Sequence, residues 1–453
     1  MNNLVSFRAS LFLFATATLA LSFAAPSHGA QAPSPSPSPR GDAPDSLGLT
    51  LPPWLTEASV TFKQGYDTNV FGTEGSRLPG TPDIANIDSW FTTISTKGTV
   101  NVLSLVGAAK GGFFTTFNLG YAGDYTSFRV DSRESNLRNN FTQSLKGKAD
   151  AWSLSIDNSI VYVVGSEVDP IYSSYSPWGY SATRERRRQS QVRNTSFLRY
   201  DGKTWFARGV ASALAYDLKI DQNNPVGAYK GYVNWIGRKD LFTGTDYGYK
   251  LKPDLAITLG WRLGQQTQAK VYSSPVHNDS TYNRALLGIE GKLLSWLQVQ
   301  LVAGPEYRRY SDASHLGLAG NRHTWLYTES SFTATAASKD TLTFTNKVWH
   351  WVSSGGGTSY QETSNSLSAK HSFSKAFAAS IGVKLQGARY DAPNVRNDWL
   401  TTYPLNVTYL LSKALTVSVD YSVARGRSRI PVTVAPGRDW NENQASVSLK
   451  FTL

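Results

Sequence analysis

The clearest pattern in the chain is an alternation of apolar and polar residues over positions 445–453. Every odd position there is apolar, from Ala445 to Leu453, and every even position is polar. Successive side chains of a β-strand point to opposite faces, so the pattern predicts a strand with one apolar and one wet face. A secreted chain that ends on such a strand is typical of a membrane barrel closed by its last strand.

The same alternation recurs along most of the chain. Clear examples are residues 152–162, 255–266, 377–386 and 415–423. Each run is near the ~9–11 residues that a tilted strand needs to cross a bilayer. From about residue 58 onward strand follows strand, and no convincing 3.6-residue periodicity is present. The sequence therefore predicts an all-β protein.

Long and short connections alternate between the predicted strands. The long connections are 72–87, 129–137, 165–188, 220–228, 269–280, 311–321, 353–358, 391–397 and 428–437. The short ones are 108–112, 147–150, 201–202, 252–254, 294–295, 338–340, 374–375 and 412–413. Long outer loops and short inner turns are the layout of an outer-membrane barrel.

This layout predicts a transmembrane antiparallel up-and-down β-barrel of about 18 strands. Sixteen strands is the alternative if two fainter pairs are misread. The weakest segment is 229–252, which is either one overlong strand or hides a turn near residues 238–240. The strand 445–453 should pair with the strand carrying Tyr66 and Asp67, because closure removes both sheet edges. Lys450 should then face water, and Phe451 and Leu453 lipid.

Tryptophans lie near the ends of the predicted strands. Trp152, Trp205 and Trp296 follow short turns, and Trp90, Trp325, Trp399 and Trp440 begin strands that return from long connections. Amphipathic rings settle at membrane interfaces, so we expect these side chains in two interfacial belts.

The N-terminal segment reads as a secretory signal. Arg8 precedes an apolar run over residues 9–25, Pro26 breaks it, and small residues follow. The run is shorter than the ~20 residues of a spanning helix, which disfavours the alternative of an uncleaved anchor. We predict a signal peptide over 1–30, a Pro/Ser-rich periplasmic leader over 31–57 and the barrel over 58–453.

Composition agrees with a barrel in an extracytoplasmic compartment. Aromatic residues make up 12% and charged residues only 17%, against ~25% charged in ordinary soluble domains. The formal charge of +12 favours anionic partners such as lipopolysaccharide or anionic solutes. The compartment argues against nucleic acid. Without cysteine the chain has no disulfide or thiolate-bound metal, and no cofactor is indicated.

Charged residues at water-facing positions are candidates for the pore lining. The candidates are Arg262, Lys370, Lys384, Lys450, Glu290 and Asp420. With Asp157 included, the cationic excess is slight, and it predicts a weak preference for anions.

A basic cluster borders the longest predicted loop. It consists of Arg184, Arg186, Arg187 and Arg188. Guanidinium groups bind phosphate and carboxylate at two points, so the cluster could contact lipopolysaccharide or anions, or constrict the pore as an infolded loop. The alternative is a solvated loop without a ligand. A second basic run, Arg425, Arg427 and Arg429, could share the role.

Two short motifs carry a family resemblance. Residues 65–71 read Gly-Tyr-Asp-Thr-Asn-Val-Phe at the end of the first strand, and residues 249–255 read Tyr-Lys-Leu-Lys-Pro-Asp-Leu across an inner turn. The chain resembles the β-barrel porin 2 family of bacterial outer membranes over roughly 58–453. The resemblance implies a porin-type barrel, and some relatives lie near exopolysaccharide export systems. The terminal Leu453 departs from the aromatic end that many such barrels present to the assembly machinery.

The sequence gives little support for an enzyme active site. His277 and His315 lie in loops beside Ser and Asp residues, but loops are rich in these residues for turn reasons alone. We therefore expect no catalytic residue, and a barrel enzyme is the third hypothesis. The first is a porin-like channel for passive diffusion of small hydrophilic, preferentially anionic, solutes. The second is a component of exopolysaccharide export or glycan binding, which would need luminal aromatic side chains. Expected partners are outer-membrane lipid, lipopolysaccharide and the barrel assembly machinery.

Overall fold

The computed structural model describes twelve stretches of the chain. These are residues 51–70, 88–108, 111–130, 135–165, 187–220, 237–268, 279–311, 320–336, 339–352, 359–391, 397–429 and 440–453. The predicted signal peptide and most of the predicted leader lie outside them. The first strand begins at Leu55, inside the segment 31–57 predicted as leader.

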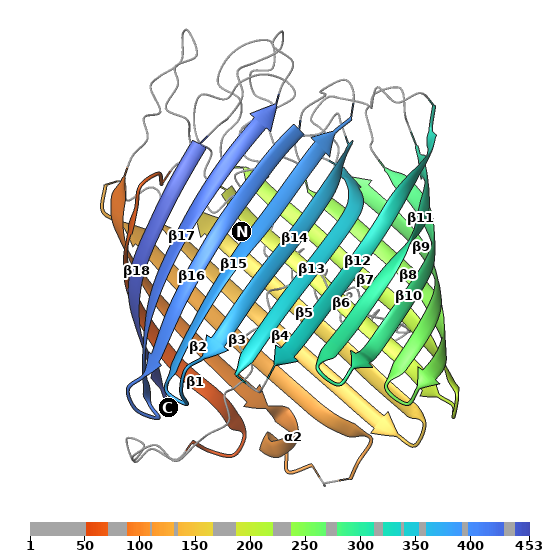
Figure 1. Ribbon diagram of the computed structural model, residues 1–453, viewed down its shortest axis with the longest axis horizontal. Helices are drawn as coiled ribbons and strands as arrows, with labels where there is room; N and C mark the ends of the chain where they lie inside the picture. The colour runs from red at the N-terminus through yellow and green to blue at the C-terminus, as the bar shows by residue number, and fades with distance from the viewer. Residues whose placement is uncertain are drawn as a thin grey trace, which may run out of the picture.

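The described chain forms one closed antiparallel sheet (Figure 1). Its strands are β1 (Leu55–Asp67), β2 (Ser89–Asn101), β3 (Phe114–Phe128), β4 (Asn136–Ala149), β5 (Trp152–Gly165), β6 (Arg187–Asp201), β7 (Trp205–Ile220), β8 (Arg238–Lys252), β9 (Leu255–Gln268), β10 (Ser280–Leu294), β11 (Leu297–Tyr310), β12 (Arg322–Ala336), β13 (Asp340–Val352), β14 (Ser359–Ser372), β15 (Phe377–Tyr390), β16 (Asn397–Leu410), β17 (Leu415–Arg429) and β18 (Trp440–Thr452). Each strand pairs with its neighbours in sequence, and β18 pairs with β1. The sheet has 18 strands, which confirms the predicted architecture and the larger strand number.

The barrel closes between the two strands that the sequence predicts. Val60 lies opposite Phe451 and Tyr66 opposite Ala445 in the β1–β18 register. Phe451 is 45% exposed on the outer face. Lys450 points to the other face, where its Nζ lies 4.0 Å from Glu57 Oε1. Closure leaves no open sheet edge, as a bilayer requires.

The motif at the end of β1 fastens this seam. The Asn69 backbone N–H donates to Asp67 Oδ1 at 2.8 Å, a local turn that Asp favours. The Asn69 side-chain amide donates to the Asn441 carbonyl at 2.9 Å, and the Asn443 backbone N–H donates to Thr68 Oγ1 at 2.8 Å. Gln444 Nε2 also donates to Asp67 Oδ2 at 3.4 Å, so three consecutive residues of the motif hold the last strand to the first.

The short connections gather at one end of the barrel, together with the C-terminus (Figure 1). In the described part of the segment 229–252, β8 runs without interruption from Arg238 to Lys252, so residues 238–240 form no turn. The predicted short turn at 108–112 needs a correction. A one-turn helix, α2 (Val102–Leu105), follows β2 directly, and the Ser104 N–H donates to Asn101 Oδ1 at 3.1 Å. A single turn is too short to produce a helical periodicity in the sequence.

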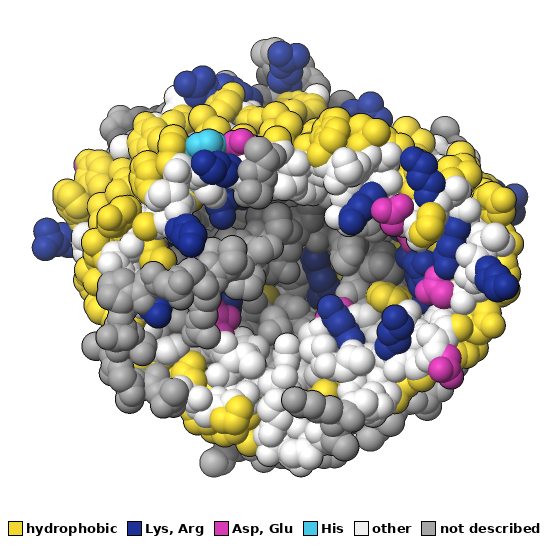
Figure 2. All heavy atoms as spheres, turned by 60° about the horizontal axis from the view of Figure 1, so that its bottom comes forward, with side chains coloured by type: hydrophobic (Ala, Val, Ile, Leu, Met, Phe, Trp, Pro, Cys, Tyr) yellow, Lys and Arg dark blue, Asp and Glu magenta, His cyan; other side chains and the backbone are white. Residues whose placement is uncertain are grey.

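The two faces of the wall differ in polarity. On β9 the outward positions Ile257, Leu259, Trp261 and Leu263 are 40–61% exposed, whereas Arg262 between them points inward and is buried. Figure 2 shows apolar side chains around the outside and a hollow with basic and acidic side chains around it. An apolar outer belt around a closed polar lumen is the architecture of a bacterial outer-membrane barrel. In the described residues no helix is long and apolar enough to cross a membrane.

Two tryptophans do not occupy the predicted interfacial belts. Trp90, Trp152 and Trp296 are about half exposed, with 50%, 46% and 52% of their surface accessible. Trp440, by contrast, is 4% exposed in a cluster of buried residues inside the barrel. Trp325 also faces inward, since its register partner is the interior residue Glu306. Parity decides the face: both residues stand on the same side of their strands as the luminal polar groups.

Candidate solute pathway and its constriction

Ion pairs that join strands across the interior identify the luminal face. Arg199 on β6 contacts Glu290 on β10 at 3.1 Å, although three strands separate them in the sheet. Arg208 on β7 reaches the same carboxylate at 3.0 Å. Side chains of strands that are not neighbours can meet only inside the barrel.

A first charged network lies on the wall from β6 to β10. Arg208 contacts Asp246 at 2.8 Å, and Arg262 contacts the same residue at 2.7 Å. Gly260 leaves the room for this contact, because a Cβ there would lie 2.5 Å from Asp246 Oδ1. Each carboxylate is shared between cations, so the network presents fixed donors with little net charge.

A second network lies nearer the opposite end and is almost fully buried. Arg308 is 0% and Glu306 is 1% exposed. Glu306 accepts from Arg284 at 2.5 Å and lies 2.7 Å from Arg308. Tyr282 donates to Asp240 at 2.8 Å beside them. Charges removed from water in this way persist only when they are paired, as these are.

The end of β13 covers this network. Pairing between β12 and β13 stops at Thr328 and Val348, although β13 stays paired with β14 as far as Val352. The His350 carbonyl accepts from Arg308 and from Gln266, both at 3.2 Å. The end of β13 therefore leaves the wall and lies across the inner surface of β9–β12.

Trp325 packs between β12 and the displaced end of β13. Its ring stacks on the His350 ring with centroids 4.0 Å apart and an interplanar angle of 6°. Trp325 lies on the inner face of β12, so the end of β13 passes on the luminal side of β12 at this level. The stacked rings hold β12 and β13 together at the level where the backbone hydrogen bonds between these two strands are missing.

The end of β14 reaches the opposite wall. Arg238 on β8 donates to Tyr360 Oη on β14 at 3.1 Å and lies over the Trp351 ring at 4.6 Å. A buried cluster extends from there to Trp440 on β18, and Leu214 of β7 packs against it. These contacts narrow the lumen at the end of the barrel away from the short turns. We name this part, built from the ends of β13 and β14 and from Arg238, the constriction.

A serine, a histidine and an aspartate meet at the constriction, but not as a catalytic triad. His350 Nε2 lies 3.0 Å from Asp391 Oδ2 and 3.2 Å from Ser359 Oγ, and Ser359 donates to the same Asp391 oxygen at 2.5 Å. A triad needs the carboxylate on the other ring nitrogen. Here Nδ1 of His350 is buried without a hydrogen-bond partner. The arrangement holds strand ends together and does not activate a nucleophile.

The loop histidines His277 and His315 lie outside the described residues. Two polar residues that follow His277 in the sequence are described: Ser280 accepts from Arg308 at 3.1 Å, and Asp279 accepts from the Gln268 N–H at 2.8 Å. In the described ranges no group of three or more His, Asp or Glu side chains could hold a metal ion.

The predicted pore-lining residues fall into two groups. Arg262, Glu290, Asp420 and Lys450 have ionic partners: the first two belong to the network above, and Asp420 lies 3.6 Å from Lys63. Lys370 and Lys384 stand opposite hydroxyl residues instead, such as Ser380 and Ser366. Among the described residues neither of these lysines forms an ion pair.

The predicted constriction loop falls mostly outside the described residues. Arg184 and Arg186 lie outside them altogether. Arg187 and Arg188 begin β6, with their backbones opposite Ile220 and Lys219. Their side chains do not belong to the described part of the structure. The role of the loop stays a prediction, while the described constriction comes from β13 and β14.

The residues that sequence reasoning missed are Arg199, Arg208, Arg284 and Arg308. A signal for two of them was present. Arg199 and Asp201, like Glu306 and Arg308, are opposite charges two positions apart on one strand face, as paired luminal charges should be. The cross-barrel partners gave no such local signal.

Comparisons with known proteins found distantly similar solved structures. No family model and no curated protein match the chain. OccK2 (OpdF) of Pseudomonas aeruginosa is similar in structure, at a TM-score of 0.41 and 12% identity, over 88% of this chain and 98% of that one. The outer membrane protein opdK of the same organism gives 0.38 and 10%, over 88% and 99%. The siderophore receptor PirA, also from Pseudomonas aeruginosa, gives 0.38 and 7%, over 87% and 80%.

Proposed function

We propose that the protein is an outer-membrane channel for passive diffusion of small hydrophilic solutes, with a modest preference for anions. The hollow, polar lumen carries the proposal (Figure 2). A barrel of this strand number leaves an aqueous passage that side chains do not fill. Solutes would cross it down their concentration gradient, past the constriction.

The charge pattern supports a modest anion preference. The arginine networks are matched by carboxylates such as Asp246 and Glu306, so they contribute oriented donors and little net field. Lys370 and Lys384 are lumen charges without an ionic partner among the described residues. Two ammonium groups in a wet lumen are screened over about 10 Å at 0.1 M salt, so the preference should be small.

Planar-bilayer recording tests this proposal. The refolded protein should conduct, and its reversal potential in asymmetric KCl should show anion preference. The double variant Lys370→Gln, Lys384→Gln should lose most of that preference. Lys239→Gln, on the outer face of β8 beside Leu241, is the matched control and should retain it. An absence of conductance would refute the channel, and cation selectivity of the parent protein would refute the preference.

The export hypothesis requires aromatic side chains along the lumen for a glycan to slide on. Several large inward-facing aromatics of the described wall are covered by their neighbours: Phe206, Tyr282, Tyr310 and Tyr360 are at most 1% exposed, whereas Trp325 and Trp349 are only partly covered. No observation therefore favours glycan export. Added oligosaccharides should leave the open-channel current unblocked.

We also propose membership of the β-barrel porin 2 family, on the residues 65–71 and 249–255. The structure supports a reason for the first motif, because Asp67, Thr68 and Asn69 fasten the seam. Secretion by a signal peptide over 1–30, and contacts with lipopolysaccharide and the assembly machinery, belong to the same proposal. Sequencing the N-terminus of the mature protein tests the cleavage.

A further inference from the structure

The wall is divided at its outer end between β12 and β13. Their pairing stops at Thr328 and Val348, yet both strands continue outward, β12 over 322–327 and β13 over 349–352. In no other pair of described strands do both partners continue past the end of their pairing to this extent. The division therefore distinguishes this place from the rest of the described barrel.

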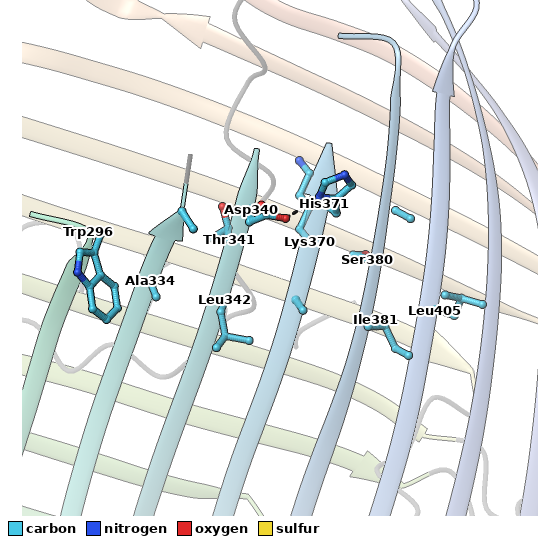
Figure 3. A pocket seen from close by; sticks show the side chains of 13 residues that line it. Trp296, Ala334, Asp340, Thr341, Leu342, Lys370, His371, Ser380, Ile381 and Leu405 are labelled. Carbon is cyan, nitrogen blue, oxygen red and sulfur yellow. Dashed lines mark hydrogen bonds and ion pairs between the residues drawn. The ribbon is translucent and has the colours of Figure 1, made fainter. Parts of the chain in front are cut away.

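Below the division the two strands share one unbroken register. Ala334 on β12 lies opposite Leu342 on β13, and both line a hollow near the short turns (Figure 3). The register runs from there without a bulge to the end of the pairing. Extended outward, it would place Leu326 opposite His350. The two unpaired edges therefore need no shift along the strands to continue their hydrogen-bond ladder.

The outer ends of three strands lie inside the wall as one layer, which we call the flap. The flap consists of 349–352 of β13, 359–362 of β14 and 388–391 of β15. Its strands stay paired with one another over this length. The flap can therefore change position as a unit, without loss of its own backbone hydrogen bonds.

The back of the flap carries polar side chains that are buried. His350 and Ser359 have the same parity on their strands as Leu342 and Leu367, which are 47% and 41% exposed on the outer face. His350 and Ser359 are nevertheless 1% and 0% exposed. The reason is that the back of the flap lies against the inner surface of β9–β12.

Side-chain groups hold the flap to this surface. The His350 ring stacks on Trp325 with centroids 4.0 Å apart, and the His350 carbonyl accepts from Arg308 at 3.2 Å. On the luminal side of the flap, Tyr360 accepts from Arg238 at 3.1 Å. Each of these contacts involves a side chain, so a change of side-chain conformation can release it.

The flap residues would also find suitable surroundings in the wall. The shared register would place Trp351 opposite Trp325 on the luminal face, as an aromatic cross-strand pair. His350 and Ser359 would then face outward near the outer ends of their strands, where water and headgroups hydrate polar side chains. The sequence of the flap is therefore compatible with both positions.

We propose that the flap is the gate of the channel: its inward position narrows the lumen, and pairing of β13 with β12 in the shared register opens it. This inference rests on the proposed channel function. The inward position replaces backbone hydrogen bonds along the β12 edge with side-chain contacts at Trp325, Arg308 and Arg238. A packed element with two such discrete arrangements is what gating requires.

A disulfide tests whether the flap reaches the wall, and the chain has no cysteine of its own. In the double variant Leu326→Cys, His350→Cys the two positions are on opposite sides of β12, since Leu326 is 59% exposed on the outer face and His350 lies on the luminal side. A disulfide should therefore form only when the flap joins the wall. Thr328→Cys, Val348→Cys, the adjacent pair on the same face, is the matched control and should oxidise directly.

Mild oxidation of the folded protein in native outer membranes gives the result. Different mobility of unheated and boiled protein on a gel shows that each variant is folded. We expect both variants to form the disulfide. A Leu326→Cys, His350→Cys variant that stays reduced while the control oxidises would overturn the proposal.

Conductance of the same variants separates the gate from the channel. The oxidised Leu326→Cys, His350→Cys protein should conduct more than the reduced protein in planar bilayers, and dithiothreitol should reverse the difference. The control should conduct equally in both forms. A disulfide that leaves the conductance unchanged would overturn the gate and leave the channel intact. A parent protein without conductance would instead refute the channel, and the disulfide yield would still report the movement.

Spin labels test the movement with His350 intact. Labels at Leu263→Cys on β9 and Arg389→Cys on the flap, both exposed on the outer face, should give two distances by pulsed electron paramagnetic resonance. The control pair replaces Arg389→Cys with Ile381→Cys, which is 62% exposed on the same strand below the flap, and should give one distance. A single distance from both pairs would show a static flap and overturn the gate.

Discussion

At the scale of single residues, the decisive feature is pairing of charges that the fold removes from water. Glu306 stands between Arg284 and Arg308, and all three are at most 4% exposed. The Coulomb attraction offsets desolvation only because both guanidinium groups share one carboxylate. Lys97 and Glu57 are 2.9 Å apart but partly exposed, so their charges keep contact with water and little desolvation energy has to be offset.

Glu306→Gln should therefore destabilise the barrel strongly. Removing one member of a buried ionic group leaves the others uncompensated, which costs about 3–5 kcal/mol. Urea unfolding of the refolded protein in lipid vesicles measures the loss. Glu57→Gln is the control and should cost less than about 1 kcal/mol. Similar losses in the two variants would contradict the account.

Residues of the motif at the end of β1 act at the same scale. Asn69→Ala removes the side-chain hydrogen bond to the Asn441 carbonyl and should cost about 1 kcal/mol. The matched control is Asn118→Ala, because Asn118 Oδ1 is buried without a partner. The same unfolding assay should show a loss for the first variant and none for the second. A larger loss for Asn118→Ala would argue against a role of the motif in closure.

At the scale of elements, the ends of β13 and β14 differ from the rest of the wall. Elsewhere each strand holds its neighbour by backbone hydrogen bonds, whereas β12 and β13 separate above Thr328 and Val348. Two side-chain contacts hold the displaced strand ends: Trp325 on β12 stacks on His350, and Arg238 on β8 donates to Tyr360 across the lumen. A strand end that is held by side-chain contacts is easier to displace by mutation than one held by backbone hydrogen bonds.

Tyr360→Ala should widen the constriction and raise single-channel conductance. The substitution removes both the phenol ring and the hydrogen bond from Arg238 that join β14 to β8. Tyr403→Ala on the outer face of β16 is the control, since Tyr403 is 45% exposed and faces away from the lumen. Conductance in planar bilayers distinguishes them. An unchanged conductance for Tyr360→Ala would place the narrowest point elsewhere.

At the scale of the whole molecule, the lumen contains charged residues that have an ionic partner and charged residues that do not. The matched arginines shape the wall, and in the proposed channel lysines such as Lys370 and Lys384 would set the sign of selectivity. Because the screening length falls from about 10 Å at 0.1 M salt to about 3 Å at 1 M, the selectivity must depend on ionic strength.

We expect the anion preference to shrink steeply as KCl is raised from about 0.1 M to about 1 M. Reversal potentials at a constant concentration ratio across the membrane measure it. A preference that did not change over this range would indicate a specific anion site, and the diffuse effect of Lys370 and Lys384 would be excluded.

Much of the architecture follows from the sequence, because alternation of period two and turn chemistry are local. They predict the strand number, the outward face of most strands and the pairing of the last strand with the first. Local patterns do not show α2, which is a single turn. The parity of β18, by contrast, already places Trp440 on the same side as Lys450, against the prediction of an interfacial position. Local patterns also miss the partners of Arg199 and Arg208, because Glu290 is distant in the chain.

The alternation of apolar and polar residues, together with the turns, is enough to predict that this chain closes into a barrel and which two strands meet at the seam. A strand carries its own two faces, and a closed sheet needs no information beyond them and the turns. The place where the wall folds inward is visible only in the folded barrel. That choice depends on contacts such as Arg238 with Tyr360, between residues on strands far apart in the sheet, and no local pattern encodes them.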